Sequence, residues 1–156
     1  MRKWLVLWFI MIPALAYGAN KDALSFTELS GEHLETRKMV TLADFHGQKT
    51  LLLFWRSDCP PCLHELALLP KIAKDNPTLS IVLISLQDEA HTRQHLTAMP
   101  ANVHVWIAQN NGKEVLAAFG SQALPFSVSL HSDGSACHTH YGILGTDTVK
   151  EWEKLC

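Results

Sequence analysis

The sequence predicts an α/β domain with a mixed central sheet and helices on both faces. Apolar runs with strand character alternate with segments of helical period, in the order βαβαβαββα. The run 79–86 is predominantly apolar, which is typical of a central strand covered on both faces. The residues Ser132-Asp133-Gly134-Ser135 separate two further strand-like runs, so we expect the sheet to close with an antiparallel hairpin.

Local signals place each element in order. Residues 26–41 are predicted to form an N-terminal β extension, either a hairpin that turns at Ser30-Gly31-Glu32 or a loose segment, and 42–47 a short turn. The helix that begins at Pro60 should stop before Asn76-Pro77. The expected strands after the extension are 50–55, 79–86, 103–108, 126–131 and 136–141. The expected helices are 60–75, 89–99, 113–119 and 146–156.

Residues 1–18 have the pattern of a secretory signal peptide. Arg2 and Lys3 precede an apolar stretch that begins at Trp4, and small residues follow it through Ala19. We expect cleavage after Gly18, which leaves residues 19–156 as the domain. The apolar stretch is shorter than the about 20 residues that span a bilayer, so an uncleaved N-terminal membrane anchor is the second choice.

Charge and organisation narrow the class of partner. The chain has 13 basic and 15 acidic residues without a basic patch, so no nucleic-acid partner is expected. It contains no internal repeat, low-complexity segment or long linker, which indicates one domain. We expect a monomer.

The most informative motif is Cys59-Pro60-Pro61-Cys62, between a predicted strand and a predicted helix. If Cys59 is the N-cap residue, Cys62 lies one turn away and can form a disulfide with it. The prolines then occupy the first two helical positions, where a missing N–H costs little. The N–H of Cys62 can donate to the sulfur of Cys59, and together with the helix dipole it should lower the pKa of that thiol. The motif predicts a redox-active couple with Cys59 as nucleophile.

Two other interpretations of the cysteine pair remain open. A purely structural disulfide is one, although a bridge across so short a loop constrains the unfolded chain least. Half of a zinc or copper site is the other, and it needs a second pair of ligands. His138 and His140 are the nearest candidates, but their spacing is shorter than is usual for paired histidine ligands.

The chain resembles the TlpA/ResA-type family of extracytoplasmic thiol-disulfide oxidoreductases. The segment 40–47, the strand that ends at Trp55 and the Cys59-Pro60-Pro61-Cys62 motif carry the resemblance, which extends from about Leu24 to the last helix. It implies a thioredoxin-like fold, a periplasmic location and an enzyme that needs no cofactor. Its implied partners are exported client proteins with disulfides, such as apocytochrome c, and a membrane-embedded thiol electron donor.

The resemblance points to further site residues. Glu65 falls where the family places an acid near the cysteines, and such a carboxylate could raise the thiol pKa values and carry protons. An ordinary surface acid is the alternative. Leu124 and Pro125 fall where the fold carries a cis-proline loop that offers the backbone to a client, whereas a trans proline ending a loop is the alternative. Apart from the resemblance, Trp55 just before the cysteine loop is a candidate for client contact, although core packing with one edge near the site is the favoured interpretation.

Three positions depart from the pattern of that family. Asp58 replaces an aromatic residue before the first cysteine, Ala67 stands where a proline is frequent, and Phe126 replaces a threonine after the proline. Asp58 should raise the pKa of Cys59 through like charge. These departures leave the identity of the client open.

The two remaining cysteines, Cys137 and Cys156, form an even pair in a chain predicted to be exported, which favours a disulfide. Such a bridge would close a loop of about 20 residues and stabilise the fold by about 3 kcal/mol. The alternative is a second redox pair that relays electrons to the first. Neither cysteine lies at a helix N-terminus, where a thiol would be activated, so we favour the structural interpretation.

The nine histidines raise the question of a metal. His138 and His140 are two residues apart on a predicted strand, so they share a face and could bind copper or zinc. Scattered surface histidines are the other interpretation, and we expect no resident metal.

Two classes of function follow from these features. An enzyme would exchange disulfides with exported proteins, whereas a binding module would hold a client without turnover. The two prolines between the cysteines should leave the Cys59 thiolate less stabilised than in a strong oxidant. The nearby acids Asp58 and Glu65 should act in the same direction. The sequence therefore predicts a disulfide reductase, with a disulfide oxidase as the alternative.

Overall fold

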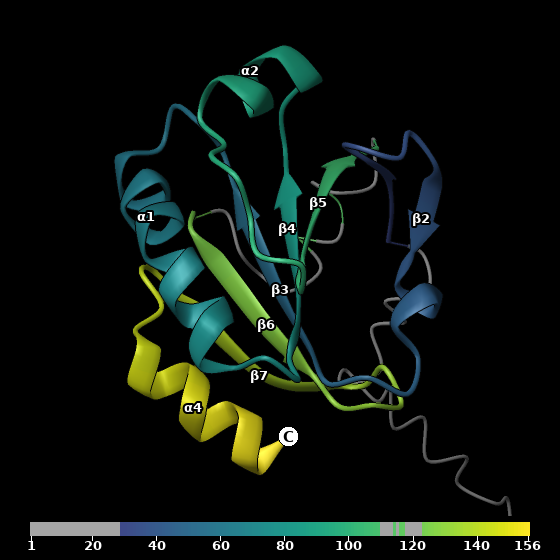
Figure 1. Cartoon of the computed structure of the whole chain (residues 1–156), viewed down its shortest axis with the longest axis vertical. Coiled ribbons are helices and arrows are strands. Elements are labelled where there is room, and N and C mark those ends of the chain that lie inside the picture. Colours follow the sequence, from purple (N-terminus) through teal and green to yellow (C-terminus); the bar gives the residue numbers. More distant parts are fainter. Residues whose placement is uncertain (1–28, 110–113, 115, 118–122) are drawn as a thin grey trace, which may run out of the picture.

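The computed structural model describes residues 29–109, 114, 116–117 and 123–156. These residues form a seven-stranded mixed sheet in the order β2-β1-β5-β4-β3-β6-β7 (Figure 1). The strands are β1 (Ser30–His33), β2 (Met39–Thr41), β3 (Thr50–Trp55), β4 (Ser80–Ser85), β5 (Val103–Ala108), β6 (Phe126–Leu130) and β7 (Ala136–Tyr141). The helices are the 3-10 helix η2 (Leu42–Phe45) and the α-helices α1 (Pro60–Asp75), α2 (Glu89–Gln94) and α4 (Thr146–Leu155).

The sheet combines parallel and antiparallel pairs, which confirms the predicted mixed architecture. The strand β3 runs parallel to β4, and β4 runs parallel to β5. On its other side β3 pairs antiparallel with β6, which pairs antiparallel with β7. The carboxyl end of β3 therefore lies at the centre of the sheet edge where α1 begins.

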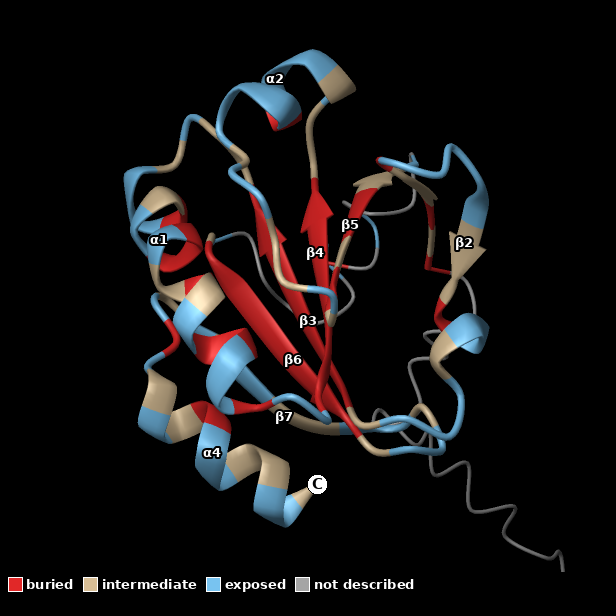
Figure 2. Cartoon of the chain, in the orientation of Figure 1, coloured by how far each residue is buried: buried red, intermediate tan, exposed pale blue. Residues whose placement is uncertain are grey.

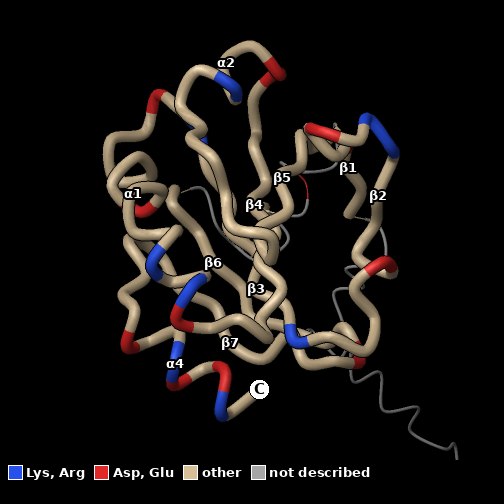
Figure 3. Tube along the Cα trace, in the orientation of Figure 1, with Lys and Arg blue, Asp and Glu red and all other residues tan. Residues whose placement is uncertain are grey.

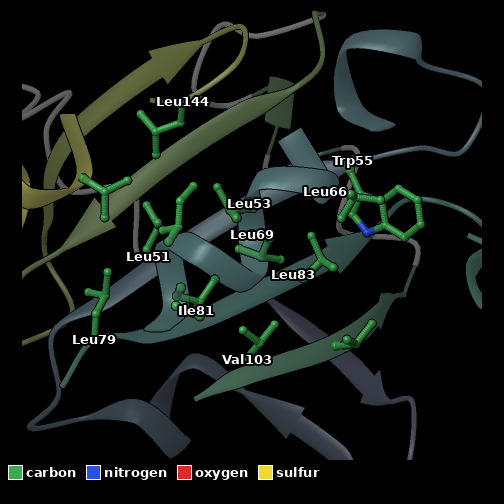
Figure 4. Packing of buried hydrophobic residues seen from close by; sticks show 14 of the residues in the cluster. Leu51, Leu53, Trp55, Leu66, Leu69, Leu79, Ile81, Leu83, Val103 and Leu144 are labelled. Carbon is green, nitrogen blue, oxygen red and sulfur yellow. The ribbon is translucent and has the colours of Figure 1, made fainter. Parts of the chain in front are cut away.

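Alternate residues of β3 pack into two separate hydrophobic cores, one on each face of the sheet. Leu51, Leu53 and Trp55 face the layer formed by α1 and α4, where Leu66 and Leu69 cover them (Figure 4). The intervening residues of β3 face a second core that contains residues of η2 and β5 and the side chain at position 116. All residues of β3, β4 and β6 are buried, and the exposed residues lie mainly on the helices and loops (Figure 2).

The N-terminal hairpin turns at a different place from the predicted one. Gly31 lies within β1 and pairs with both neighbouring strands, and the chain turns at residues 34–38. A Cβ atom on Gly31 would lie 2.9 Å from the carbonyl oxygen of Ile107, so the absence of a side chain serves close strand packing. The prediction of a turn at Ser30-Gly31-Glu32 was wrong because glycine also occurs where two strand backbones approach each other closely, and not only in turns.

The helix predicted over 89–99 is shorter than expected and ends at Gln94. Leu96 and Met99 leave the helical path and pack against the core on the α1 side. Their burial outweighs the preference of the segment for continued helix. By contrast, β3 and α1 have the predicted bounds.

Some predictions fall on other parts of the chain. The signal peptide, the beginning of the N-terminal extension and most of the helix predicted over 113–119 lie outside the described residues. Within the described part, no helix is both long enough and apolar enough to cross a membrane.

Candidate active site

The two cysteines of the motif lie where β3 delivers the chain into α1. Cys59 is the N-cap of α1 in an extended conformation, with φ −114° and ψ 100°, and Pro60 and Pro61 are the first two helical residues. The backbone N–H of Cys62 donates to Sγ of Cys59 across 3.2 Å. This is the arrangement that the spacing predicts, because the prolines leave Cys62 as the first helical donor.

The two sulfur atoms differ in exposure. They form a disulfide, with Cα atoms 5.2 Å apart. Cys62 is fully buried, at 0% exposed, whereas Cys59 is partly exposed at the helix start. A sulfur atom of another protein can therefore reach Cys59 more readily than Cys62, which suits Cys59 to attack and Cys62 to act from within.

The loop before Cys59 is held by two side-chain contacts. The N–H of Ser57 donates to the side-chain oxygen of Gln87, which follows β4. Arg56 donates from Nε and Nη2 to the two carboxylate oxygens of Asp58, each across 2.8 Å. These hydrogen bonds lower the pKa of Asp58. The guanidinium also offsets the negative charge that we expected to act on Cys59, and sequence reasoning overlooked this pairing although the two residues are only two positions apart.

Glu65 lies on α1, about one turn after Cys62, and is buried. It is three residues after Cys62 on α1, so the two side chains share one face of the helix, and Glu65 is only 3% exposed. Burial raises the pKa of Glu65 to about 7, an effect that a hydrogen bond from Leu144 partly opposes. Among the described residues, no basic side chain pairs with it. The interpretation as a solvated surface acid is therefore wrong.

Leu144 is a site residue that sequence reasoning missed. Its backbone N–H donates to Oε1 of Glu65 across 2.8 Å, and its side chain is fully buried in the core beside α1 (Figure 4). It lies in the connection between β7 and α4, far from Glu65 in the sequence. In the sequence, this position is marked only by an apolar pair, Ile143 and Leu144, between two glycines.

The loop before β6 lies next to the end of β3. Phe126 pairs with Phe54, so Pro125 is level with the last residue of β3, from which the chain enters the cysteine loop. The bond between Leu124 and Pro125 is cis, and the carbonyl of Pro125 accepts from the N–H of Gly142 across 2.9 Å. Leu124 is partly buried and packs against both cores. The fold thus brings these residues to the sheet edge that carries Cys59.

Trp55 lies in the hydrophobic core. Its side chain is 1% exposed and packs in the core between β3 and α1. The alternating pattern of the strand explains this position, since Trp55 follows Leu51 and Leu53 on the same face. Of the two interpretations of Trp55, its burial supports core packing and not client contact.

An open depression lies beside the cysteine loop. It is lined mainly by polar residues of that loop and of the segment that follows β4, together with one leucine: Arg56, Ser57, Asp58, Leu86, Gln87, Asp88 and His91. The ring Nδ1 of His91 lies 2.8 Å from Asp88. Lysine and arginine are interspersed with acidic residues along the described chain (Figure 3), so this depression offers mixed charge rather than a field of one sign.

A disulfide couple at the start of the helix that follows the central strand of a thioredoxin-like sheet is the centre of a thiol-disulfide oxidoreductase, and the protein is an enzyme of this class. Comparison with known proteins gives the same answer. The chain belongs to the Redoxin family, which matches it over residues 19–155.

Individual relatives have related descriptions. The chain is 23% identical over 142 residues to the thiol-disulfide oxidoreductase ResA of Halalkalibacterium halodurans, covering 88% of this chain and 76% of that protein. It is 28% identical over 110 residues to the sporulation thiol-disulfide oxidoreductase A of Bacillus subtilis, covering 68% and 67% of the two chains. These matches confirm the resemblance stated from the sequence.

A solved structure agrees on the fold. The exposed lipoprotein thioredoxin of Streptococcus pneumoniae superposes with a TM-score of 0.67 at 23% identity, over 81% of this chain and 98% of that one. At this level of identity the likeness shows the thioredoxin-like fold alone.

Proposed function

We propose that the protein reduces disulfides in exported proteins. The observation that carries this proposal is that Glu65, about one helical turn after Cys62 on α1, is buried without a basic partner among the described residues. An ionised carboxylate at this position disfavours thiolates by like charge. A couple whose reduced form is poorly stabilised gives up its electrons readily, which is the property of a reductant.

The reaction follows from the difference in exposure between the cysteines. The Cys59 thiolate attacks one sulfur of the client disulfide, the client S–S bond breaks, and the leaving client sulfur takes a proton. The sulfur of Cys62 then attacks Cys59, which releases the second client thiol and forms the Cys59–Cys62 disulfide. Two electrons and two protons pass to the client. Glu65 accepts the proton that Cys62 loses, because a carboxyl group with a pKa of about 7 exchanges protons near neutral pH.

The client contacts the loop that carries Leu124 and Pro125. This proposal rests on the strand register, which places that loop at the edge where Cys59 lies. An extended client segment that pairs with the backbone there would present its disulfide to Cys59. In this proposal Leu124 and Pro125 bind the client, whereas Cys59, Cys62 and Glu65 are the catalytic residues.

The compartment and the electron donor belong to the same proposal. Residues 1–18 act as a signal peptide, and residues 19–156 form the exported domain in the periplasm. The description of the pneumococcal relative as an exposed lipoprotein supports an extracytoplasmic setting. A membrane-embedded thiol donor restores the reduced couple, and apocytochrome c is one client with suitable cysteines.

The reduction potential of the Cys59–Cys62 couple tests the direction. We expect a value near about −250 mV or below, as in reducing thioredoxins. Equilibration of the C137A/C156A variant with dithiol–disulfide buffers, followed by alkylation and mass measurement, gives the potential of this couple alone. A value near about −120 mV, typical of a strong periplasmic oxidant, would contradict the proposal.

We propose that the second bridge is structural. It joins Cys137 on β7 to Cys156 after α4, and the Cα atoms are 5.9 Å apart. The C137A/C156A variant should lose about 3 kcal/mol of unfolding free energy in urea, because the open loop gains entropy in the unfolded chain. The C59A/C62A variant, which opens a much shorter loop, should lose about 2 kcal/mol.

Activity separates this role from an electron relay. Insulin disulfide reduction by the C137A/C156A variant should equal that of the unmodified chain at a temperature where both are folded. A folded variant without activity would show that the second pair takes part in electron transfer.

A further inference from the structure

Three side chains that can bind a metal meet where the end of α4 contacts β7. The sulfur atoms of Cys137 and Cys156 and a ring nitrogen of His138 all lie within 4.8 Å of one another. All three residues are partly buried, so they are enclosed by the protein but still accessible from solvent. None of them contributes to the Cys59–Cys62 couple.

A bulge in β7 explains how neighbouring residues share this site. In a regular strand Cys137 and His138 would point to opposite faces. Here Ser129 pairs with His138 whereas Leu130 pairs with Ala136, so Cys137 is an extra residue on the β7 side. Both side chains meet α4: Cys137 through the disulfide, and His138 by stacking on Trp152 with ring centroids 5.4 Å apart.

Contacts other than the disulfide hold each ligand in place. The N–H of Cys156 donates to the carbonyl of Trp152 across 2.8 Å, and Nδ1 of His131 lies 3.1 Å from the backbone oxygen of Cys156. The buried hydroxyl of Ser129 lies 3.2 Å from Sγ of Cys156 and accepts a hydrogen bond from the N–H of His138. The hydroxyl hydrogen is therefore available to a thiolate at Cys156. These contacts keep the three ligands near one another when the bridge is open.

We propose that Cys137, His138 and Cys156 bind one Cu(I) ion when their disulfide is reduced. A dithiol reductant supplies two electrons and two protons to the bridge, becomes a disulfide itself and leaves two thiols on this chain. Binding of Cu(I) then displaces the two thiol protons, and the ion is held by two thiolates and a neutral imidazole.

The number and type of ligands select the ion. Two thiolates are soft donors and an imidazole is a borderline one, and this set suits Cu(I) and Zn(II). Structural Zn(II) sites use four protein ligands, whereas Cu(I) is stable with three. Among the described residues no fourth cysteine, histidine or carboxylate joins this group. Stacking on Trp152 fixes the His138 ring, as supporting contacts do for ligands in metal sites.

The disulfide and the metal exclude each other, because the same sulfur atoms form both. The protein would therefore bind copper only when the Cys137–Cys156 disulfide is reduced. This inference is independent of the proposed reductase activity, since it uses neither Cys59 nor Cys62.

The test uses the full chain with C59S/C62S, so that the other cysteine pair cannot bind copper. The protein is reduced with dithiothreitol, freed of it without oxygen, and titrated with Cu(I) against bathocuproine disulfonate. We expect one bound ion per reduced chain and none on the oxidised chain. His138→Ala should weaken binding at least about tenfold. The matched control is His140→Ala, on the same strand and also against Trp152 but outside the cluster, which should leave the affinity unchanged.

Several outcomes would overturn the proposal: no Cu(I) on the reduced chain, equal affinity for the His138 and His140 variants, or retention of Zn(II) in place of Cu(I) when both are offered. Far-UV circular dichroism checks that each variant is folded. X-ray absorption spectroscopy of copper bound to the C59S/C62S chain identifies the coordinating atoms without use of the His138→Ala variant. Coordination by sulfur atoms alone would also contradict the proposed site.

Discussion

Replacement of Cys62 by serine is expected to trap client proteins on Cys59. The accessible sulfur of Cys59 can still attack a disulfide, but nothing then displaces the client from the mixed disulfide. Multiple turnover in insulin reduction should fall to the uncatalysed background. Non-reducing electrophoresis and mass spectrometry of the C62S protein after exposure to a disulfide-containing client should show a covalent complex in about equal amount to the protein.

The matched variant is Cys59→Ser, which keeps the fold and the other cysteine. Because Cys62 is fully buried, this variant should form no complex and show no activity. Accumulation of a complex on Cys62 in the C59S protein would reverse the assignment of the two roles. In the C137A/C156A background any complex can only involve the active pair, which removes the other cysteines as a source of trapping.

Glu65 is expected to make the folded protein less stable as the pH rises. Its pKa is raised from 4.5 to about 7 in the folded chain, so between these values the unfolded chain loses this proton while the folded chain retains it. The stability that protonated Glu65 contributes is complete below about pH 4.5 and is lost as the pH passes 7. The shift corresponds to a loss of about 3 kcal/mol by pH 8. The free energy of unfolding in urea, determined for the oxidised protein at pH 5 to 8, measures this loss of stability.

Comparison with Glu65→Gln isolates this effect. Burial lowers the pKa of His104, which gives stability an opposite trend, rising with pH in the same range. That trend is common to the protein and the variant, so their difference in unfolding free energy reports Glu65. The variant should gain relative stability as the pH rises, whereas Glu151→Gln, at an exposed position on α4, should follow the unmodified protein. A difference independent of pH would show that Glu65 does not titrate in this range.

The same substitution tests the role of Glu65 in exchange. Removal of the carboxylate should lower the apparent pKa of the reduced cysteine pair, because a like charge is lost, and should slow exchange near neutral pH, because a proton acceptor is lost. Thiolate absorbance against pH gives the first quantity and insulin reduction against pH the second. Unchanged profiles in both would leave Glu65 with a purely structural role.

The geometry of the cysteine couple follows from local sequence. The N-cap position of Cys59, the prolines in the first turn and the donation from Cys62 to Cys59 all depend on contacts within four residues. Short-range rules of helix capping suffice for them. The bounds of β3 and α1 were predictable for a similar reason, since an apolar run and proline signals mark their ends.

Other features depend on residues that are distant in the sequence. Glu65 acquires its raised pKa because the fold buries it, and the hydrogen bond that its carboxylate accepts, which partly opposes that rise, comes from Leu144, 79 residues later. Trp55 is in the core because the sheet is covered on that face by α1. Gly31 is in a strand because β5 approaches its backbone closely.

What the sequence alone determined is therefore the chemistry of the cysteine pair, since a helix start is built from consecutive residues. Tertiary structure decided which side chains surround that pair and which residues meet elsewhere. The bulge at Cys137 that brings His138 beside two cysteines is an example, because the pairing of β7 with β6 sets it. A local apolar pattern indicates which face of a strand is buried, but the residues that meet across that face depend on how the strands pair in the assembled sheet.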